Sequence, residues 1–170
     1  QPRRLDRLAS DLLEVLVHVD EPAVLVAHSW GGPVVRTVAA RAPQRVAGLV
    51  LVDQTDEGCA LYFRKGFEAQ EQRFATLIPT VARLGLTRLF ATRVARTLPP
   101  EDRKAMAAKD GSVAQARTHR AELLACNADL RQLRDEPLTL PDVPVTYLSG
   151  ARSTRFSAKQ RECLVAAHRA

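Results

Sequence analysis

The stretch VLVAHSWGG, residues 24–32, constrains the fold more than any other part of this 170-residue chain. It opens with four apolar residues in a row, which is typical of a strand buried in a parallel sheet. Beyond it, apolar side chains recur three and four positions apart and Pro33 lies in the first turn, so the pattern predicts a helix over 31–42. Ser29 is therefore expected on a sharp turn between a strand and a helix.

A serine at such a turn is suited to nucleophilic chemistry. It lies at a helix N-terminus, where unpaired N–H groups and the helix dipole favour negative charge. The pattern matches the nucleophile elbow G-x-S-x-G, with Ala27 in place of the first glycine. It predicts Ser29 as the nucleophile and the backbone N–H of Trp30 as a donor to an oxyanion. The alternative is a serine that only caps the helix.

A second apolar run, VAGLVLV at 46–52, predicts another buried strand that ends at Asp53. Strand, helix and strand within about 30 residues form a βαβ unit. Its two strands must be parallel, and its crossover right-handed. The sequence thus predicts an α/β fold with the elbow at its centre.

The stretch VLVAHSWGGPVVRTVAARAPQRVAGLVLVDQ resembles the middle of an α/β-hydrolase. It is similar to the serine-nucleophile branch, which includes esterases, haloperoxidase-like proteins and peptidases; Ser29 argues against epoxide hydrolases and haloalkane dehalogenases, which have aspartate there. The resemblance covers about residues 1–55 and is weaker over 138–169. It implies a partial α/β-hydrolase fold of about three parallel strands, flanking helices and a helical cap. It also implies cleavage of an ester, amide or related acyl bond through an acyl-enzyme on Ser29, with no metal or other cofactor.

Three segments are expected along the chain: core with the elbow over 1–55, helical cap over 56–136, and core again over 137–170. Apolar spacing predicts helices at 3–19, 31–42, 57–78, 81–98, after Pro100, at 113–134 and at 158–169. A third strand is predicted at 145–148. Ser157 and Gln160 form a capping box for the last helix.

The triad of the family follows the order serine, acid, histidine, and the acid lies at the end of a later strand. After Leu148 there is no carboxylate until Glu162, so the usual acid position is empty. Asp53, at the end of the second strand, is the candidate acid, with Asp56 behind it. Asp53 as a mere loop cap stays open, because aspartate is favoured in turns.

None of the four histidines is expected to be the base. His18 is expected at the surface or in packing, and His28 to fill space behind the elbow. His119 and His168 lie on helices, where structural roles are expected. The resemblance then implies a catalytic histidine beyond this chain. We expect an internal fragment of a hydrolase, with little activity alone and exposed sheet edges that favour association.

Composition narrows the class of protein. Hydrophobic content of 46% and charged content of 26% are ordinary for a soluble domain, and neither a membrane helix nor a signal peptide is visible. Three widely spaced cysteines, Cys59, Cys126 and Cys163, predict neither a disulfide framework nor a metal site, which favours the cytoplasm. The net charge of +6 is dispersed and aromatic residues are few, which argues against nucleic acid.

Two other functions remain open beside an enzyme that acts on a small-molecule acyl substrate. A non-catalytic member of the same fold would bind a ligand under its cap. The stretch RLGLTRLFATRVARTL, residues 83–98, would instead form a basic amphipathic helix that binds anionic surfaces.

Overall fold

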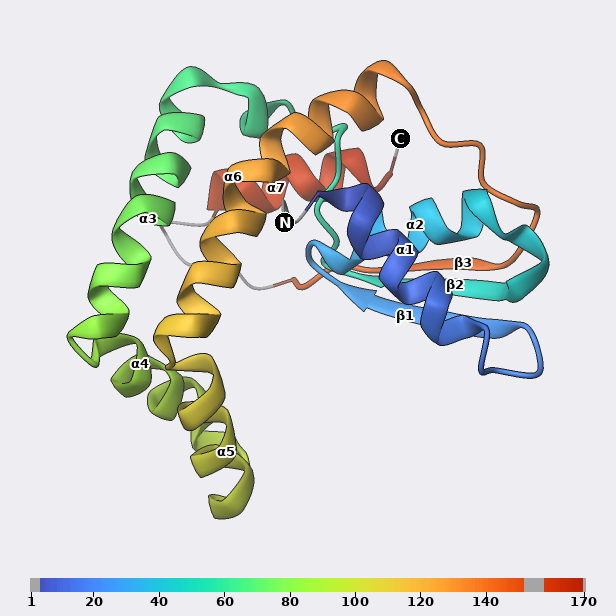
Figure 1. Cartoon of the computed structure of the whole chain (residues 1–170). Helices are drawn as coiled ribbons and strands as arrows, with labels where there is room; N and C mark the ends of the chain where they lie inside the picture. Colours follow the sequence, from blue (N-terminus) through green and yellow to red (C-terminus); the bar gives the residue numbers. More distant parts are fainter. Residues whose placement is uncertain (1–3, 152–157, 170) are drawn as a thin grey trace. The chain divides into compact units, whose positions relative to one another are not determined.

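The structure, a computed structural model, describes residues 4–151 and 158–169 (Figure 1). The chain divides into two compact units. The sheet unit comprises residues 4–64 and the described residues from 127 onward. The helical unit comprises residues 65–126 and is inserted between the two parts of the sheet unit.

The sheet unit contains three parallel strands in the order β1-β2-β3: β1, Ala23–His28; β2, Val46–Val52; and β3, Val145–Leu148. The predicted α/β class, with three parallel strands and flanking helices, is therefore confirmed. His28, Val52 and Leu148 are aligned across the sheet. The residues that follow them, Ser29, Asp53 and Ser149, consequently emerge at the same carboxyl edge.

Two helices, α1 at Leu5–Leu16 and α2 at Gly31–Arg41, pack against each other and supply one side of the core (Figure 1). The buried cluster combines residues of these helices with alternate strand residues: Ala9, Leu16, Leu25, Ala27, Val35, Val38, Ala39, Val46, Leu49 and Leu51. Arg4 and the backbone N–H of Leu5 bind the buried carboxylate of Asp129, which fixes the start of α1.

The prediction that β1 is fully buried was wrong. Its side chains alternate, with Leu25 and Ala27 buried while Val24 and Val26 are 58% and 68% exposed. A continuous apolar run does not distinguish a strand covered on both faces from one covered on a single face. Here α1 and α2 join the described core from one face only.

Short helices and α7 complete the sheet unit. Their bounds are η1, Pro43–Arg45; η2, Ala60–Phe63; and α7, Ala158–Ala167. The last helix ends two residues earlier than predicted, and Ser157 of the expected capping box lies outside the described residues. Helix α1 also ends before the predicted residue 19, and Val17 and Val19 are exposed.

The prediction of unpaired cysteines was wrong. Cys59 and Cys163 form a disulfide with their Cα atoms 5.3 Å apart, although 104 residues separate them in sequence. Spacing along the chain could not reveal this pair, because the fold brings the loop before η2 against α7. A reducing cytoplasm was inferred from the absence of disulfides, so that inference loses its basis.

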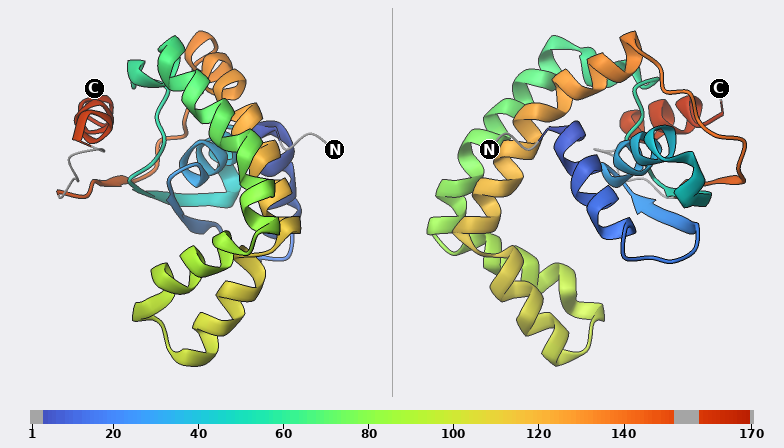
Figure 2. Two further views of the ribbon diagram at one scale, coloured as in Figure 1. Left: turned by 90° about the vertical axis from the view of Figure 1, so that its left-hand side faces the viewer. Right: turned by 45° about the vertical axis from the view of Figure 1, so that its right-hand side comes forward.

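The helical unit consists of α3, Lys65–Arg83; α4, Leu86–Val94; η3, Ala95–Thr97; α5, Pro100–Asp110; and the first part of α6, Val113–Asp135 (Figure 2). Helix α3 starts later than predicted and continues through Pro79. It ends at Arg83, and Gly85 just before α4 has a φ of 76°, the left-handed conformation that suits glycine. The prediction of one helix over 81–98 was therefore wrong, because the chain turns at this glycine. No single described helix is long and apolar enough to cross a membrane.

Candidate active site

Ser29 is held in a strained backbone conformation where β1 ends. Its φ is 54°, which is uncommon for a residue with a side chain. Its N–H donates to the carbonyl oxygen of Val52 at 3.2 Å, and its own carbonyl accepts from Gly32 at 3.1 Å and Thr55 at 3.0 Å. These three hydrogen bonds fix the turn, so the strain is maintained by the surrounding backbone.

The close approach of the first turn of α2 to the loop after β2 explains the glycine at position 32. A Cβ atom there would lie 2.4 Å from the Cβ and Oε1 atoms of the fully buried Gln54. At Gly31, a Cβ would lie 3.4 Å from the Cβ of Ala27, which is an ordinary to tight contact. The small residues of the motif thus let the elbow pack against β1 and against the loop that follows β2.

The side chain of Ser29 does not cap α2. Trp30 occupies the N-cap position, and no side-chain hydrogen bond caps the helix. Within the described residues, neither the Ser29 hydroxyl nor the Trp30 backbone N–H has a hydrogen-bond partner. The hydroxyl and the adjacent donor are therefore both available to a ligand.

Asp53 has the same kind of backbone as Ser29, one strand further along the sheet. Its φ is 42°, and these two are the non-glycine residues with positive φ in the described chain. The Asp53 N–H donates to the carbonyl of Leu148 at 2.7 Å. Both candidate catalytic residues thus occupy strained turns at neighbouring strand ends, as functional residues often do.

The carboxylate of Asp53 is bound at one oxygen. Oδ1 accepts a hydrogen bond from the Gly150 N–H at 2.8 Å and another from the guanidinium of Arg161 in α7. Burial favours the neutral acid, but the Gly150 hydrogen bond, Arg161 and the charge of His28 together outweigh it. They lower the pKa of Asp53, so the group is a carboxylate at neutral pH.

A cavity of about 190 Å³ brings the candidate residues together. Its lining consists of His28, Ser29, Asp53, Thr55, Tyr62, Gln160, Arg161 and Leu164. The expected position of His28 behind the elbow was wrong, because its side chain is exposed and lines this cavity. As the last residue of β1, it points to the face of the sheet opposite the buried Ala27.

Asp56, the second candidate acid, is engaged elsewhere. It is buried, its Oδ2 accepts from the Gln54 amide at 2.9 Å, and its Oδ1 accepts from the Gly58 N–H at 2.8 Å. It is not among the residues that line the cavity. Its carboxylate shapes the loop after β2, as an aspartate in a turn commonly does.

That loop is also held by a partly buried ion pair. Arg36, on α2, makes two parallel hydrogen bonds to Glu57, of 3.0 and 2.5 Å. Paired guanidinium and carboxylate groups in this geometry are strongly directional. The pair fastens the loop that carries Asp53 to the helix that begins at the elbow.

None of the other three histidines is among the described residues that line this cavity. In His168, Nδ1 lies 2.9 Å from the Ser149 hydroxyl and Nε2 lies 3.1 Å from the carbonyl oxygen of Gln54. His18 is exposed after α1, and His119 lies on α6 in the helical unit. Within residues 4–151 and 158–169, no cluster of histidine, cysteine or acidic side chains could hold a metal ion.

Sequence reasoning missed the contribution of α7 to this site. Arg161, Gln160 and Leu164 come from a helix more than 100 residues away from Ser29 in the chain. Helical periodicity predicted the helix but not which side chains face the sheet edge. The Gln160 amide lies 3.4 Å from the Tyr62 hydroxyl, which adds a polar contact beside the disulfide.

The alpha/beta hydrolase fold family model matches residues 4–168, and the chain belongs to this family. It is 39% identical over 92 residues to the dihydrolipoyllysine-residue acetyltransferase component of the acetoin cleaving system from Pseudomonas putida. That match covers 52% of this chain and 25% of the relative, so the chain spans about a quarter of the relative's length. No solved structure matches the chain significantly.

Proposed function

We propose that Ser29 is the nucleophile of a serine hydrolase that cleaves an ester, amide or related acyl bond of a small molecule. The observation that carries the proposal is the strained Ser29 turn, with its uncapped hydroxyl in a cavity that also contains Asp53. A helix cap would not need the left-handed backbone and would direct its hydroxyl to the helix. A nucleophile needs its hydroxyl accessible.

In the proposed reaction, Ser29 Oγ attacks the acyl carbon while its proton passes to a base. The developing oxyanion accepts a hydrogen bond from the Trp30 N–H, at the positive end of α2. The leaving group departs with the proton, and water then releases the acyl group. The proposed base is a histidine outside the described residues, and His28, which lines the same cavity as Ser29, is the alternative.

Asp53 is the proposed acid that orients this histidine. It lines the cavity with Ser29, whereas both oxygens of Asp56 are used by its own loop. A carboxylate with a lowered pKa stays ionised and can stabilise an imidazolium. Within the described residues, both hydrogen bonds to Asp53 go to Oδ1, which leaves Oδ2 to accept from a histidine.

Covalent labelling tests the nucleophile directly. A fluorophosphonate probe should label the full-length protein at Ser29, and Ser29→Ala should remove labelling and turnover together. Ser149→Ala is the matched control, because Ser149 also follows a strand at this edge but contacts His168. Labelling that persists in Ser29→Ala would contradict the assignment, and wild-type protein without labelling or turnover would favour a non-catalytic ligand-binding member of the fold.

Acyl transfer is a second candidate, since the bacterial relative is described as an acetyltransferase component. The same acyl-Ser29 intermediate would then pass its acyl group to a thiol or alcohol in place of water. Turnover of an activated ester with and without an added thiol distinguishes the two. A product distribution dominated by the thioester at modest thiol concentration would favour transfer.

We also propose that the helical unit acts as a cap that selects the substrate. It interrupts the sheet unit between β2 and β3, and in α/β sheets the loops at the carboxyl edge form ligand sites. Substitutions in the helical unit should then change KM among substrates more than they change labelling of Ser29. Equal effects on every substrate would speak against this role.

A further inference from the structure

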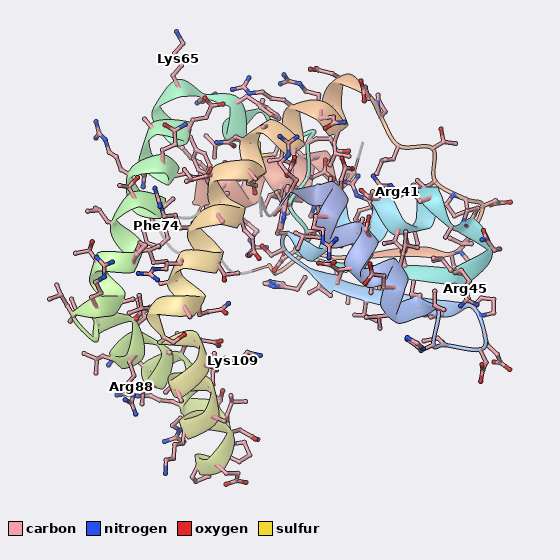
Figure 3. The ribbon with its side chains drawn as sticks, viewed as in Figure 1. Arg41, Arg45, Lys65, Phe74, Arg88 and Lys109 are labelled. Carbon is pink, nitrogen blue, oxygen red and sulfur yellow. A yellow bond between two sulfur atoms is a disulfide. The ribbon has the colours of Figure 1, made fainter. Side chains whose placement is uncertain are left out.

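Residues 72–100 form a segment with an unusual charge pattern. It contains no aspartate, glutamate or lysine and carries five arginines: Arg73, Arg83, Arg88, Arg93 and Arg96. All five are exposed, and Phe74 and Arg88 mark the segment in Figure 3. Within the described residues, none of these guanidinium groups is in an ion pair. Their positive charge is therefore not neutralised by neighbouring carboxylates.

Large apolar side chains gather on the same segment, where α3 and α4 meet. The two helices are bent by 97° across Gly85, and we call this region the α3–α4 junction. Leu84, Leu89 and Phe90 are 71%, 69% and 69% exposed, and Leu86 and Val94 are also exposed. Apolar residues this exposed and this close together usually mark an interaction surface.

Helix α4 is oriented opposite to an ordinary surface helix. Its small residue Ala91 is buried, together with Ala95 just beyond its end, while Leu89 and Phe90 are largely exposed, although Phe90 also lines a cavity of this unit. A helix that only packed on its own unit would bury Leu89. The outward face therefore indicates contact with something outside this unit.

The α3–α4 junction also borders an open, mostly apolar cavity of about 620 Å³ within the helical unit. Phe74 and Leu77 on α3 and Leu86, Phe90 and Val94 on α4 contribute to its lining. These side chains extend the exposed apolar surface inward from the α3–α4 junction. Apolar chains that enter from outside would meet a lining that is mostly apolar, with Thr87, Asp110, Gln115 and His119 as its polar members.

We propose that the α3–α4 junction binds the surface of an anionic lipid bilayer. Leu84, Leu89 and Phe90 enter the boundary between headgroups and acyl chains, while the arginines contact lipid phosphates. Exposed apolar and arginine side chains on one short helix are the combination that interfacial helices use. The lack of carboxylates in residues 72–100 favours an anionic partner, and the apolar residues favour a lipid surface over a soluble polyanion. The helices α3 and α4 are bent by 97° at their junction, and the proposal places this pair on the bilayer surface.

Vesicle co-sedimentation tests the proposal without any requirement for activity. The full-length protein should bind vesicles of equal parts phosphatidylglycerol and phosphatidylcholine at low salt. It should bind pure phosphatidylcholine much less, and high salt should weaken binding because surface charges are screened. Equal binding to both vesicle types, or no binding to either, would overturn the proposal.

Paired substitutions locate the binding surface. Arg88→Gln with Arg93→Gln should lower the partition coefficient by about 30-fold, because each arginine near an anionic surface contributes about a fivefold change. Lys104→Gln with Lys109→Gln is the control, since it removes the same charge from exposed positions on α5 (Lys109 is labelled in Figure 3). An equal loss of vesicle binding in both double variants would show attraction by net charge alone and would overturn the assignment to the α3–α4 junction.

The apolar contribution needs its own variant. Leu89→Ser with Phe90→Ser keeps every charge and should still reduce vesicle binding at high salt at least tenfold, since buried apolar area drives that part. Circular dichroism should show unchanged helix content. Two results would overturn the proposal: a salt-sensitive complex with an oligonucleotide but not with vesicles, or self-association lost in this variant with vesicle binding intact.

Discussion

Arg161 on α7 binds the carboxylate of Asp53 at the end of β2, and 108 residues separate the two in sequence. The contact connects a helix late in the chain to the strand edge that carries the candidate catalytic residues. Both side chains are about three-quarters buried, so the ion pair is partly shielded from solvent. Asp53 therefore has a fixed position and a defined charge.

The lowered pKa of Asp53 predicts a specific dependence of stability on pH. A carboxyl whose pKa is lower in the folded than in the unfolded chain stabilises the fold above its unfolded pKa, about 4. That stabilisation is lost as the pH falls through the lower folded value. Urea unfolding should show wild type more stable than Asp53→Asn at pH 6, by on the order of 1 kcal/mol.

The difference between wild type and Asp53→Asn should shrink at pH values below the folded pKa. Arg161→Gln should behave in the same direction, because it removes one of the contacts that lower the pKa. A constant difference from neutral to acidic pH would contradict the ionised pair as its source.

The proposed role of Asp53 in catalysis predicts a large kinetic effect. In the full-length protein, Asp53→Asn should lower kcat on the order of 10⁴-fold, as expected when the histidine loses the carboxylate that sets its tautomer. Asp56→Asn should have a much smaller effect on kcat, because Asp56 binds its own loop. Steady-state kinetics and melting temperatures should be measured for both variants. A mild effect of Asp53→Asn on kcat would indicate that Asp53 only caps its loop.

Gly32→Ala should destabilise the sheet unit by about 1–3 kcal/mol, the usual cost of overpacking. The added Cβ would lie 2.4 Å from the Cβ and Oε1 atoms of the buried Gln54. Gly66→Ala is the matched control, since a Cβ there meets nothing within 4 Å and alanine favours the helix. Denaturant unfolding should separate the two variants, and equal stabilities would refute the close packing.

Non-reducing peptide mapping should recover one cross-linked species that contains Cys59 and Cys163. Cys163→Ser should abolish it and lower stability by about 2–5 kcal/mol, because the bond closes a loop of more than 100 residues. Cys126→Ser should leave the cross-link intact. A cross-link that involves Cys126 in the wild-type protein would contradict this pairing.

The sequence was sufficient for the backbone around Ser29. The apolar run, the small residues and Pro33 predicted a strand, a sharp turn and a helix, and the structure has all three. These features are local, since they depend on residues within about ten positions. The parallel pairing of β1 with β2 also followed, because a short βαβ connection allows few arrangements.

Features that depend on residues distant in sequence could not be predicted in this way. The Cys59–Cys163 bond and the Arg161–Asp53 pair join segments separated by the whole helical unit. The exposure of the His28 side chain could not be predicted either, because it depends on which face of the sheet the helices cover. The outward-facing side chains of α4 were likewise hidden, since periodicity gives an apolar stripe but not its direction.

The disulfide closes a covalent loop that contains the entire helical unit, residues 65–126. The entropy needed to close such a loop rises only with the logarithm of its length, so a longer or shorter insertion changes it little. The insertion is thus an exchangeable module between two covalently joined anchor points. Descendants of such a chain can acquire new helices, and with them new partners, while the turns at Ser29 and Asp53 remain as they are.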